Sequence, residues 1–154
     1  DQIGKLLQSY DINDFLIEIG GEILVSGMND KGNKWEIGIN TPSDENTDLF
    51  SIISISNSAI ATSGIYHNYF ELNGKKYSHI INPHNGYPIE HDLVSATIIA
   101  DECSFADAIA TSVMVKGYED GIKWINSLEN VEGFLISKNE NGSYISVKSN
   151  GFNY

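Results

Sequence analysis

The sequence predicts an α+β fold with a largely antiparallel sheet and helices packed on one side of it. Short segments with two-residue alternation of apolar and polar side chains fill most of the first hundred residues. Two segments with helical spacing follow, and a further pair of strand-like segments comes after them. Strands grouped before and after the helices, instead of alternating with them one by one, favour an antiparallel sheet over a parallel one.

Composition predicts one domain over residues 1–154 and argues against several functions. The chain has 154 residues, of which 41% are hydrophobic, and this is enough for a buried core. Its formal net charge of −12 argues against nucleic acid and anionic lipid as partners, because both attract clustered Lys and Arg. The single cysteine, Cys103, excludes a disulfide framework. No apolar run reaches the roughly 20 residues that span a bilayer, so no direct membrane insertion is expected.

The first forty residues are predicted to hold one helix and three strands. Apolar residues at helical spacing predict a helix over 2–10. Alternation predicts strands over 15–19, 22–26 and 35–41. Gly20-Gly21, between the first two strands, is either a tight turn or a place where a ligand approaches the backbone closely.

The middle of the chain is predicted to be mostly strand. Pro, Ser, Asp and Asn predict a loop over 41–48. Two β-like runs follow over 50–58 and 59–64. Residues 66–82 are expected to form a hairpin with Asn73-Gly74 at its turn, because Asn-Gly favours the two-residue turns of hairpins.

The last third supplies the two helices. Residues 83–92 contain two of the three prolines and predict a loop, and the β-branched run over 93–100 predicts a buried strand. Helical spacing then predicts helices over 104–116 and 118–128. A hairpin is expected over 132–147.

The first of these helices carries a polar pair. Asp107 and Thr111 are four residues apart, so their side chains lie on the same face, one turn apart. A carboxylate and a hydroxyl both offer the hard oxygen ligands that Mg²⁺ prefers. The alternative is structural, because Asp interacts well with a helix start and Thr can bond to the preceding turn. Spacing alone leaves both interpretations open.

Histidines and small residues give further candidates. None of the four histidines has the spacing of a zinc site: they are His67, His79, His84 and His91. His79 lies where a predicted strand meets a Pro-containing loop, so it is either a site residue or a strand-end histidine bonded to backbone. Ser63-Gly64 is either a turn or a ligand contact.

The order of these motifs resembles the FAD:protein FMN transferase family, also called ApbE, through nearly the whole chain. The most specific parts are Ser63-Gly64-x-Tyr66, then His79-Ile80-Ile81-x-Pro83 followed by Gly86 and Pro88, then Asp107-Ala108-x-Ala110-Thr111. The resemblance implies a T-fold-like α+β domain.

The resemblance also implies an activity. Family members bind FAD and Mg²⁺, transfer the FMN part of FAD to a Thr or Ser hydroxyl of a target protein, and release AMP. Targets include flavin-carrying subunits of membrane redox pumps. The alternative is a relative that only binds FAD, or one that hydrolyses FAD to FMN and AMP without labelling a protein. A structural or interaction domain is a third possibility.

Site residues follow from the same resemblance. Asp107 and Thr111 match the magnesium ligands, and His79 matches a histidine that serves the transfer chemistry near the pyrophosphate. The remaining positions match residues that line the flavin nucleotide pocket, and Ile81 among them contacts it through its backbone: Gly20, Gly21, Ser63, Gly64, Tyr66 and Ile81.

Three features depart from the family pattern. Asn82 stands where most members have Asp, and Ala110 stands where some carry a second acid. The chain resembles the C-terminal half of the domain, without the N-terminal half that supplies other FAD contacts. The isolated chain is therefore expected to be an incomplete domain that binds FAD poorly and transfers nothing. The family further suggests a bacterial, extracytoplasmic protein that is lipid-anchored at full length, with the signal outside this chain.

Overall fold

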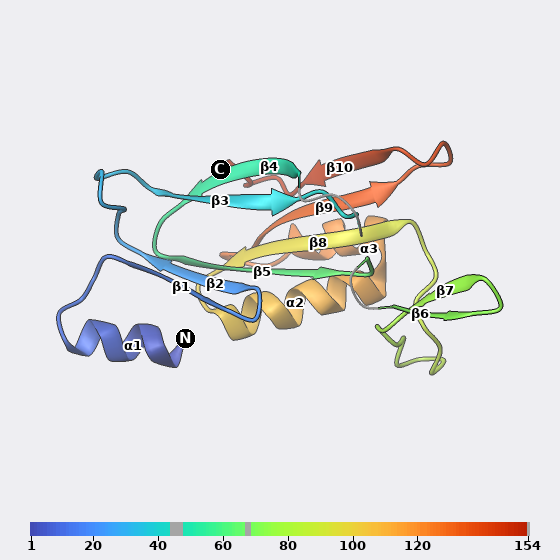
Figure 1. The fold of residues 1–154 in the computed structure, drawn as a ribbon, viewed down its shortest axis with the longest axis horizontal. Coiled ribbons are helices and arrows are strands. Elements are labelled where there is room, and N and C mark those ends of the chain that lie inside the picture. The colour runs from blue at the N-terminus through green and yellow to red at the C-terminus, as the bar shows by residue number, and fades with distance from the viewer. Residues whose placement is uncertain (44–47, 67–68, 154) are drawn as a thin grey trace.

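One antiparallel sheet of six strands organises the chain. In the computed structural model, which describes residues 1–43, 48–66 and 69–153, the strand order in this sheet is β1-β2-β5-β8-β9-β10. Two short hairpins, β3–β4 and β6–β7, form separate two-stranded sheets (Figure 1). The helices are α1 (Gln2–Ser9), α2 (Cys103–Lys116) and α3 (Tyr118–Ile125). The strands are β1 (Phe15–Ile19), β2 (Glu22–Ser26), β3 (Trp35–Asn40), β4 (Leu49–Ile55), β5 (Ser58–Gly64), β6 (Tyr69–Leu72), β7 (Lys75–Ser78), β8 (Leu93–Ala100), β9 (Glu132–Lys138) and β10 (Tyr144–Lys148).

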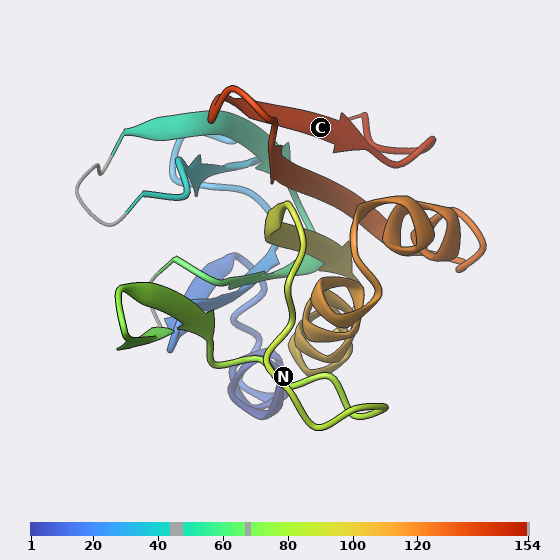
Figure 2. The ribbon, with the colours of Figure 1, turned by 90° about the vertical axis from the view of Figure 1, so that its right-hand side faces the viewer.

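The sheet lies between two layers. Figure 2 shows α2 and α3 on one side of its central strands and the β3–β4 hairpin on the other. Each interface holds an apolar cluster. Ala96, Ile98 and Leu135 pack toward the helices, whereas Ile99 and Ile136 pack toward β3 and β4. Both faces of β8 are therefore covered, which is why nearly all of its residues are buried and its sequence lacks the alternation of a half-exposed strand.

The predicted fold class and every predicted helix and strand in the described residues are confirmed, with small shifts at the ends. The helix predicted over 118–128 ends at Ile125 instead of Leu128, because tighter i→i−3 bonds to Trp124 and Ile125 close its last turn. The predicted loop over 41–48 lies partly outside the described residues, and so does His67. None of the helices in the described part of the chain is long and apolar enough to cross a membrane.

Helix α2 is held at its start by a residue far away in the sequence. Asp1 accepts hydrogen bonds from the backbone N–H of Cys103 at 2.7 Å and of Ser104 at 3.0 Å. These are two of the N–H groups that a helix leaves without an internal partner. Along its length, α2 buries Ala106, Ala110 and other small or apolar residues against β5 and β8.

The register of β2 leaves room beside the end of β5. The last β5 residue that β2 pairs is Ile60, opposite Ile23, because β2 begins at Glu22 immediately after the turn from β1. From Ala61 to Gly64, β5 pairs with β8 alone. The space beside this stretch opens onto the exposed face of α2.

Candidate functional site

A cavity of about 490 Å³ occupies this space. Its walls come from the β1–β2 turn, the middle of β3, the end of β5, His79 and the exposed face of α2. Every site residue predicted from the sequence lines it, with the exception of Ile81: Gly20, Gly21, Ser63, Gly64, Tyr66, His79, Asp107 and Thr111. The fold therefore gathers residues from four separate segments around one opening.

The paired glycines form a tight turn at the rim of this cavity. Ile19 pairs with Glu22, so Gly20 and Gly21 are the two central residues of a hairpin turn. Their φ angles are +71° and +107°, and positive values at both positions define the turn type that matches the twist of the strands. A Cβ at Gly21 would meet nothing within 4 Å. Backbone conformation, and not lack of room, therefore accounts for the glycine at this position.

Asp107 and Thr111 lie on the face of α2 that is turned away from the core. Both are exposed and line the cavity, whereas Ala106 and Ala110 on the same helix are fully buried. The Thr111 hydroxyl makes a 2.9 Å hydrogen bond with the hydroxyl of Ser63 on β5. The structural alternative for Thr111, a bond to the preceding helical turn, is instead taken by its neighbour Ser112, which donates to the carbonyl of Ala108 at 2.7 Å.

Gly64 and Tyr66 form the end wall of the cavity. A Cβ at Gly64 would lie 2.4 Å from the ring of Tyr66, so the ring packs directly over the glycine. Burial raises the pKa of the Tyr66 phenol above its ordinary value of 10.0, and a hydrogen bond with Ser95 offsets part of that rise. The phenol is therefore uncharged at neutral pH.

His79 is exposed and enters the cavity from the end of β7. The residues on both sides of it are buried, and Ser78 fixes the chain direction because its hydroxyl accepts a bond from the N–H of Ile80 at 3.0 Å. The imidazole is thus carried on an anchored backbone. This placement agrees with the prediction of a site residue where a strand meets the loop.

Ile81 does not line this cavity. It is 48% exposed and forms an isolated antiparallel bridge with Pro88. The bridge closes a loop whose two ends, Ile80 and Ile89, are both buried in the core on the helix side of the sheet. Its backbone contact with a flavin nucleotide stays a prediction.

The two departures at Asn82 and Ala110 have structural explanations. The side-chain carbonyl of Asn82 accepts a bond from the N–H of His84 at 2.9 Å, a turn-forming role that needs no charge. Ala110 is fully buried in the apolar cluster between α2 and the sheet and does not line the cavity. An acid at position 110 would therefore meet this apolar packing in the fold.

A further histidine has a role in holding the fold together. A ring nitrogen of His91 lies 2.6 Å from the carbonyl oxygen of Met114, which belongs to the last turn of α2. Carbonyls in the last turn have no partner inside the helix, so the imidazole completes this end. His91 does not line the candidate cavity.

Several lining groups were missed by sequence reasoning. The Ile65 N–H donates a hydrogen bond to the carbonyl of Val94. In an antiparallel pair, the N–H and C=O groups of alternate residues point toward and away from the partner strand. Those of Thr62 and Gly64 therefore point away from β8, toward the cavity. Glu18 and Glu22 stand at the rim. Backbone groups carry no signal in side-chain pattern, and the two glutamates read as ordinary solvent-facing strand residues.

The donor set fits a magnesium ion that is shared with a phosphate ligand. No group of three or more His, Cys, Asp or Glu side chains in the described residues could hold a metal by itself. Mg²⁺ commonly takes only one or two carboxylates and completes its shell with water and substrate phosphates. Asp107 and Thr111, exposed side by side in a polar cavity, match that mode of binding. The carboxylates at the rim also favour a cation between the protein and any anionic ligand.

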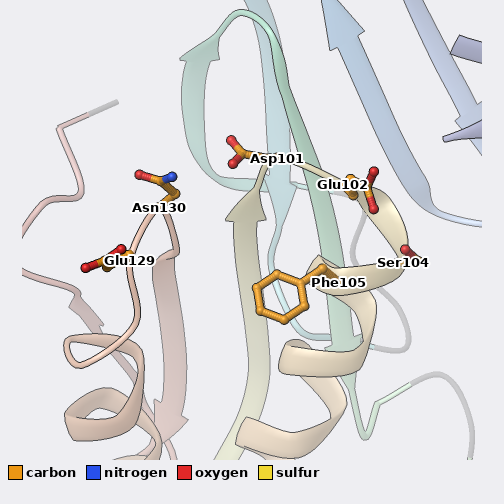
Figure 3. Close-up of a pocket in the computed structure, with 6 residues that line it drawn as sticks. All are labelled: Asp101, Glu102, Ser104, Phe105, Glu129 and Asn130. Carbon is orange, nitrogen blue, oxygen red and sulfur yellow. The ribbon is translucent and has the colours of Figure 1, made fainter. Parts of the chain in front are cut away.

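A second cavity, of about 370 Å³, lies at the start of α2 and between Asp101 and Glu129 (Figure 3). It contains none of the predicted site residues. Helix starts attract anions through free N–H groups, but here Asp1 already occupies those of Cys103 and Ser104. Glu102, which also lines this cavity, pairs with Lys5 at 3.3 Å. The cavity beside β5 is therefore the candidate functional site.

Comparison with known proteins shows the family of the chain. The model of the ApbE family matches residues 1–135. A FAD:protein FMN transferase of Vibrio cholerae is 41% identical over 92% of this chain and 42% of its own length. That of Escherichia coli K12 is 38% identical over 90% of this chain and 39% of its own length. The chain thus spans about 40% of the length of these curated relatives.

Solved structures show the same fold. The flavin transferase ApbE from Vibrio cholerae superimposes with a TM-score of 0.85 at 37% identity, covering 99% of this chain and 47% of that one. The apo form of the flavinyl transferase ApbE from Pseudomonas stutzeri gives a TM-score of 0.83 at 30% identity, covering 99% of this chain and 46% of that one. The family model, the sequence identities and the shared fold agree, and the chain belongs to the ApbE family.

Proposed function

We propose that this chain contributes to a site that transfers the FMN part of FAD to a Ser or Thr hydroxyl of a target protein and releases AMP. The observation that carries the proposal is the cavity itself, which brings Asp107, Thr111 and His79 together beside Gly64. The relatives' name, FAD:protein FMN transferase, supports FAD as the donor and a protein as the acceptor.

The proposed reaction is a phosphoryl transfer, so the protein mainly has to position groups and balance charge. The oxygen of the acceptor hydroxyl forms a bond to the phosphorus of the FMN part. The bond from that phosphorus to the bridging oxygen breaks, and the electron pair leaves with AMP. Bound Mg²⁺ supplies charge neutralisation for the phosphate oxygens and for this leaving group.

The residues of this chain divide the remaining tasks. Asp107 and Thr111 hold the cation one helical turn apart on α2. His79 receives the proton of the attacking hydroxyl, because a neutral imidazole is a suitable base near pH 7. Tyr66, seated over Gly64 with an uncharged phenol, shapes the end of the pocket without adding charge near the phosphates.

The test is covalent labelling of an acceptor. A chain of the relatives' length that contains residues 1–154 is given FAD, Mg²⁺ and an acceptor protein, and flavin fluorescence is measured on the denatured acceptor. Asp107→Ala should lower the rate at least about 100-fold, because several kcal/mol of charge stabilisation depend on the cation. Asp120→Ala, which removes an exposed carboxylate from α3 outside the cavity, is the control and should keep the rate.

The outcomes separate the possible functions. An unlabelled acceptor with release of free FMN and AMP would replace the transferase with an FAD hydrolase. An unlabelled acceptor with no products at all would contradict both. Full activity of Asp107→Ala would contradict the metal assignment alone. The 154-residue chain by itself is expected to transfer no flavin in the same assay.

The acceptor and the compartment are further parts of the proposal. We infer from the resemblance that the acceptor is a flavin-carrying subunit of a membrane redox pump and that the protein acts on the outer side of a bacterial inner membrane. Flavin fluorescence on proteins of the membrane fraction, compared between cells with and without the gene, tests both. An unchanged set of labelled bands would contradict this acceptor class.

A further inference from the structure

Two hydroxyls join the central sheet to α2 inside the candidate site. Ser63 Oγ on β5 and Thr111 Oγ1 on α2 are 2.9 Å apart, although 48 residues separate them in the sequence. Both residues line the cavity. The bond therefore connects Thr111, a proposed metal ligand, to a strand that carries no predicted metal ligand of its own.

The two elements are held firmly on either side of this bond. Ser63 pairs with Ala96 on β8, and Ala96 is fully buried. On α2, Ala110 and Val113 on either side of Thr111 are also fully buried. Packing thus fixes the backbone positions of Ser63 and Thr111, and the hydrogen bond fixes the rotamer of the Thr111 side chain.

The hydrogen bond also determines what Thr111 can offer to a cation. A hydroxyl oxygen that binds a cation gives it a lone pair, so its proton has to be donated to another acceptor. Ser63 Oγ is such an acceptor at 2.9 Å. With Thr111 as the donor, a lone pair of Thr111 Oγ1 is left for the cavity on the side of Asp107.

We propose that Ser63 is a positioning residue that orients the Thr111 hydroxyl toward a divalent cation beside Asp107. The inference rests on the proposed function, because it assumes that Asp107 and Thr111 bind the cation. It gives Ser63 a specific role, orienting Thr111, beyond its place in the lining of the cavity. Ser63 acts through Thr111 and makes no bond to the cation itself.

The first experiment measures metal binding directly, without catalysis. A chain of the relatives' length that contains residues 1–154 is titrated with Mn²⁺ in the presence of FAD and without an acceptor protein. Free Mn²⁺ is followed by electron paramagnetic resonance, with Mg²⁺ as competitor. Ser63→Ala should weaken Mn²⁺ binding about 10- to 100-fold, the usual effect of removing a group that orients a metal ligand. Ser63→Thr keeps the hydroxyl and should restore most of the affinity.

Ser112→Ala is the matched control. It removes a hydroxyl from the next residue of α2, but this hydroxyl bonds to Ala108 and does not line the cavity. It should leave Mn²⁺ affinity unchanged. Melting curves without metal should be alike for the two alanine variants, so a fall in affinity confined to Ser63→Ala does not come from loss of folding.

A double-variant cycle separates positioning from direct binding. Thr111→Val removes the hydroxyl at nearly constant volume, and adding Ser63→Ala to it should then have no further effect on Mn²⁺ binding. Losses that add in the double variant would show that Ser63 meets the cation independently, and would overturn the inference.

The remaining outcomes distinguish this inference from the proposed function. Unchanged Mn²⁺ affinity in Ser63→Ala, with binding by the parent chain that depends on Asp107, would overturn the role of Ser63 alone. A parent chain with no Mn²⁺ binding would overturn it together with the metal assignment, while flavin transfer is still tested by the acceptor assay.

Discussion

At the scale of single residues, the contact between Gly64 and Tyr66 is the tightest in the site. The aromatic ring occupies the place where a side chain at position 64 would begin, and the carbonyl oxygen of Val94 lies 3.2 Å from the same point. Glycine is needed here for space, because Gly64 does not have the positive φ found at Gly20 and Gly21. Within the motif Ser63-Gly64-x-Tyr66, the glycine and the tyrosine thus pack as a pair, and Ser63 bonds to Thr111 instead.

The residue-scale prediction concerns this contact. Gly64→Ala should destabilise the protein by about 1–3 kcal/mol, the usual cost of overpacking, because the Tyr66 ring has to leave its position. Chemical denaturation measures the free energy of unfolding. The same substitution in a Tyr66→Ala background should cost clearly less, because the ring is gone. An equal cost in both backgrounds would contradict the packing explanation.

At the scale of elements, α2 depends on a residue that is distant in sequence for its first turn. The residue at its N-terminal boundary, Glu102, makes no side-chain capping bond, and the first turn of α2 contains no acidic residue. Asp1 supplies the capping carboxylate instead, with one oxygen on each of two N–H groups. The same helix carries Asp107 and Thr111, so its position against β5 determines the geometry of the site.

The element-scale prediction is that this distant cap behaves like a local one. Asp1→Ala should lower the free energy of unfolding by about 1 kcal/mol, the typical cost of losing a helix cap. Thermal unfolding measures the change. Asp30→Ala, which removes an exposed carboxylate of the same charge from the β2–β3 turn, is the control and should have little effect. Equal melting temperatures for both variants would show that Asp1 does not stabilise α2.

At the scale of the whole molecule, stability comes from the two apolar interfaces on either side of the central sheet. Leu135 on β9 is fully buried on the helix side, beside a cluster that includes Ile98, Val113 and Ile125. This interface fixes α2 and α3 against the sheet. It therefore holds in place the helix that forms one wall of the candidate site.

The prediction at this scale is a large loss of stability when a buried side chain of this interface is shortened. Leu135→Ala should lower the free energy of unfolding by about 2–5 kcal/mol, because a cavity replaces buried methyl groups. Urea denaturation measures this free energy. An unchanged slope of the free energy of unfolding against urea concentration would show that the variant keeps the same fold. Ile145→Ala on the neighbouring strand β10 is the control, since Ile145 is 47% exposed. A similar loss for both variants would contradict a dominant role for the helix-side core.

The sequence by itself determined the local structure and most of the candidate residues that line the cavity. Alternation and helical spacing report which face of a segment is apolar, and this predicted the helices and the strands. The Asn-Gly pair predicted the turn at Asn73-Gly74, whereas Gly20-Gly21 was left open between a tight turn and a ligand contact. The order of the motifs indicated the family and placed His79, Asp107 and Thr111 in one site. These features depend on neighbours a few residues apart, so a linear pattern carries them.

Tertiary structure alone decided how distant segments meet. The cap of α2 by Asp1, the bond from Ser63 to Thr111 and the peptide groups of Thr62 and Gly64 that face the cavity all depend on the register between strands and on helix docking. No spacing along the chain encodes these contacts. The same holds for Ile81, which does not line the cavity although four residues of β5 and His79 do. Motif order therefore predicted which residues matter, and long-range packing determined which of them touch.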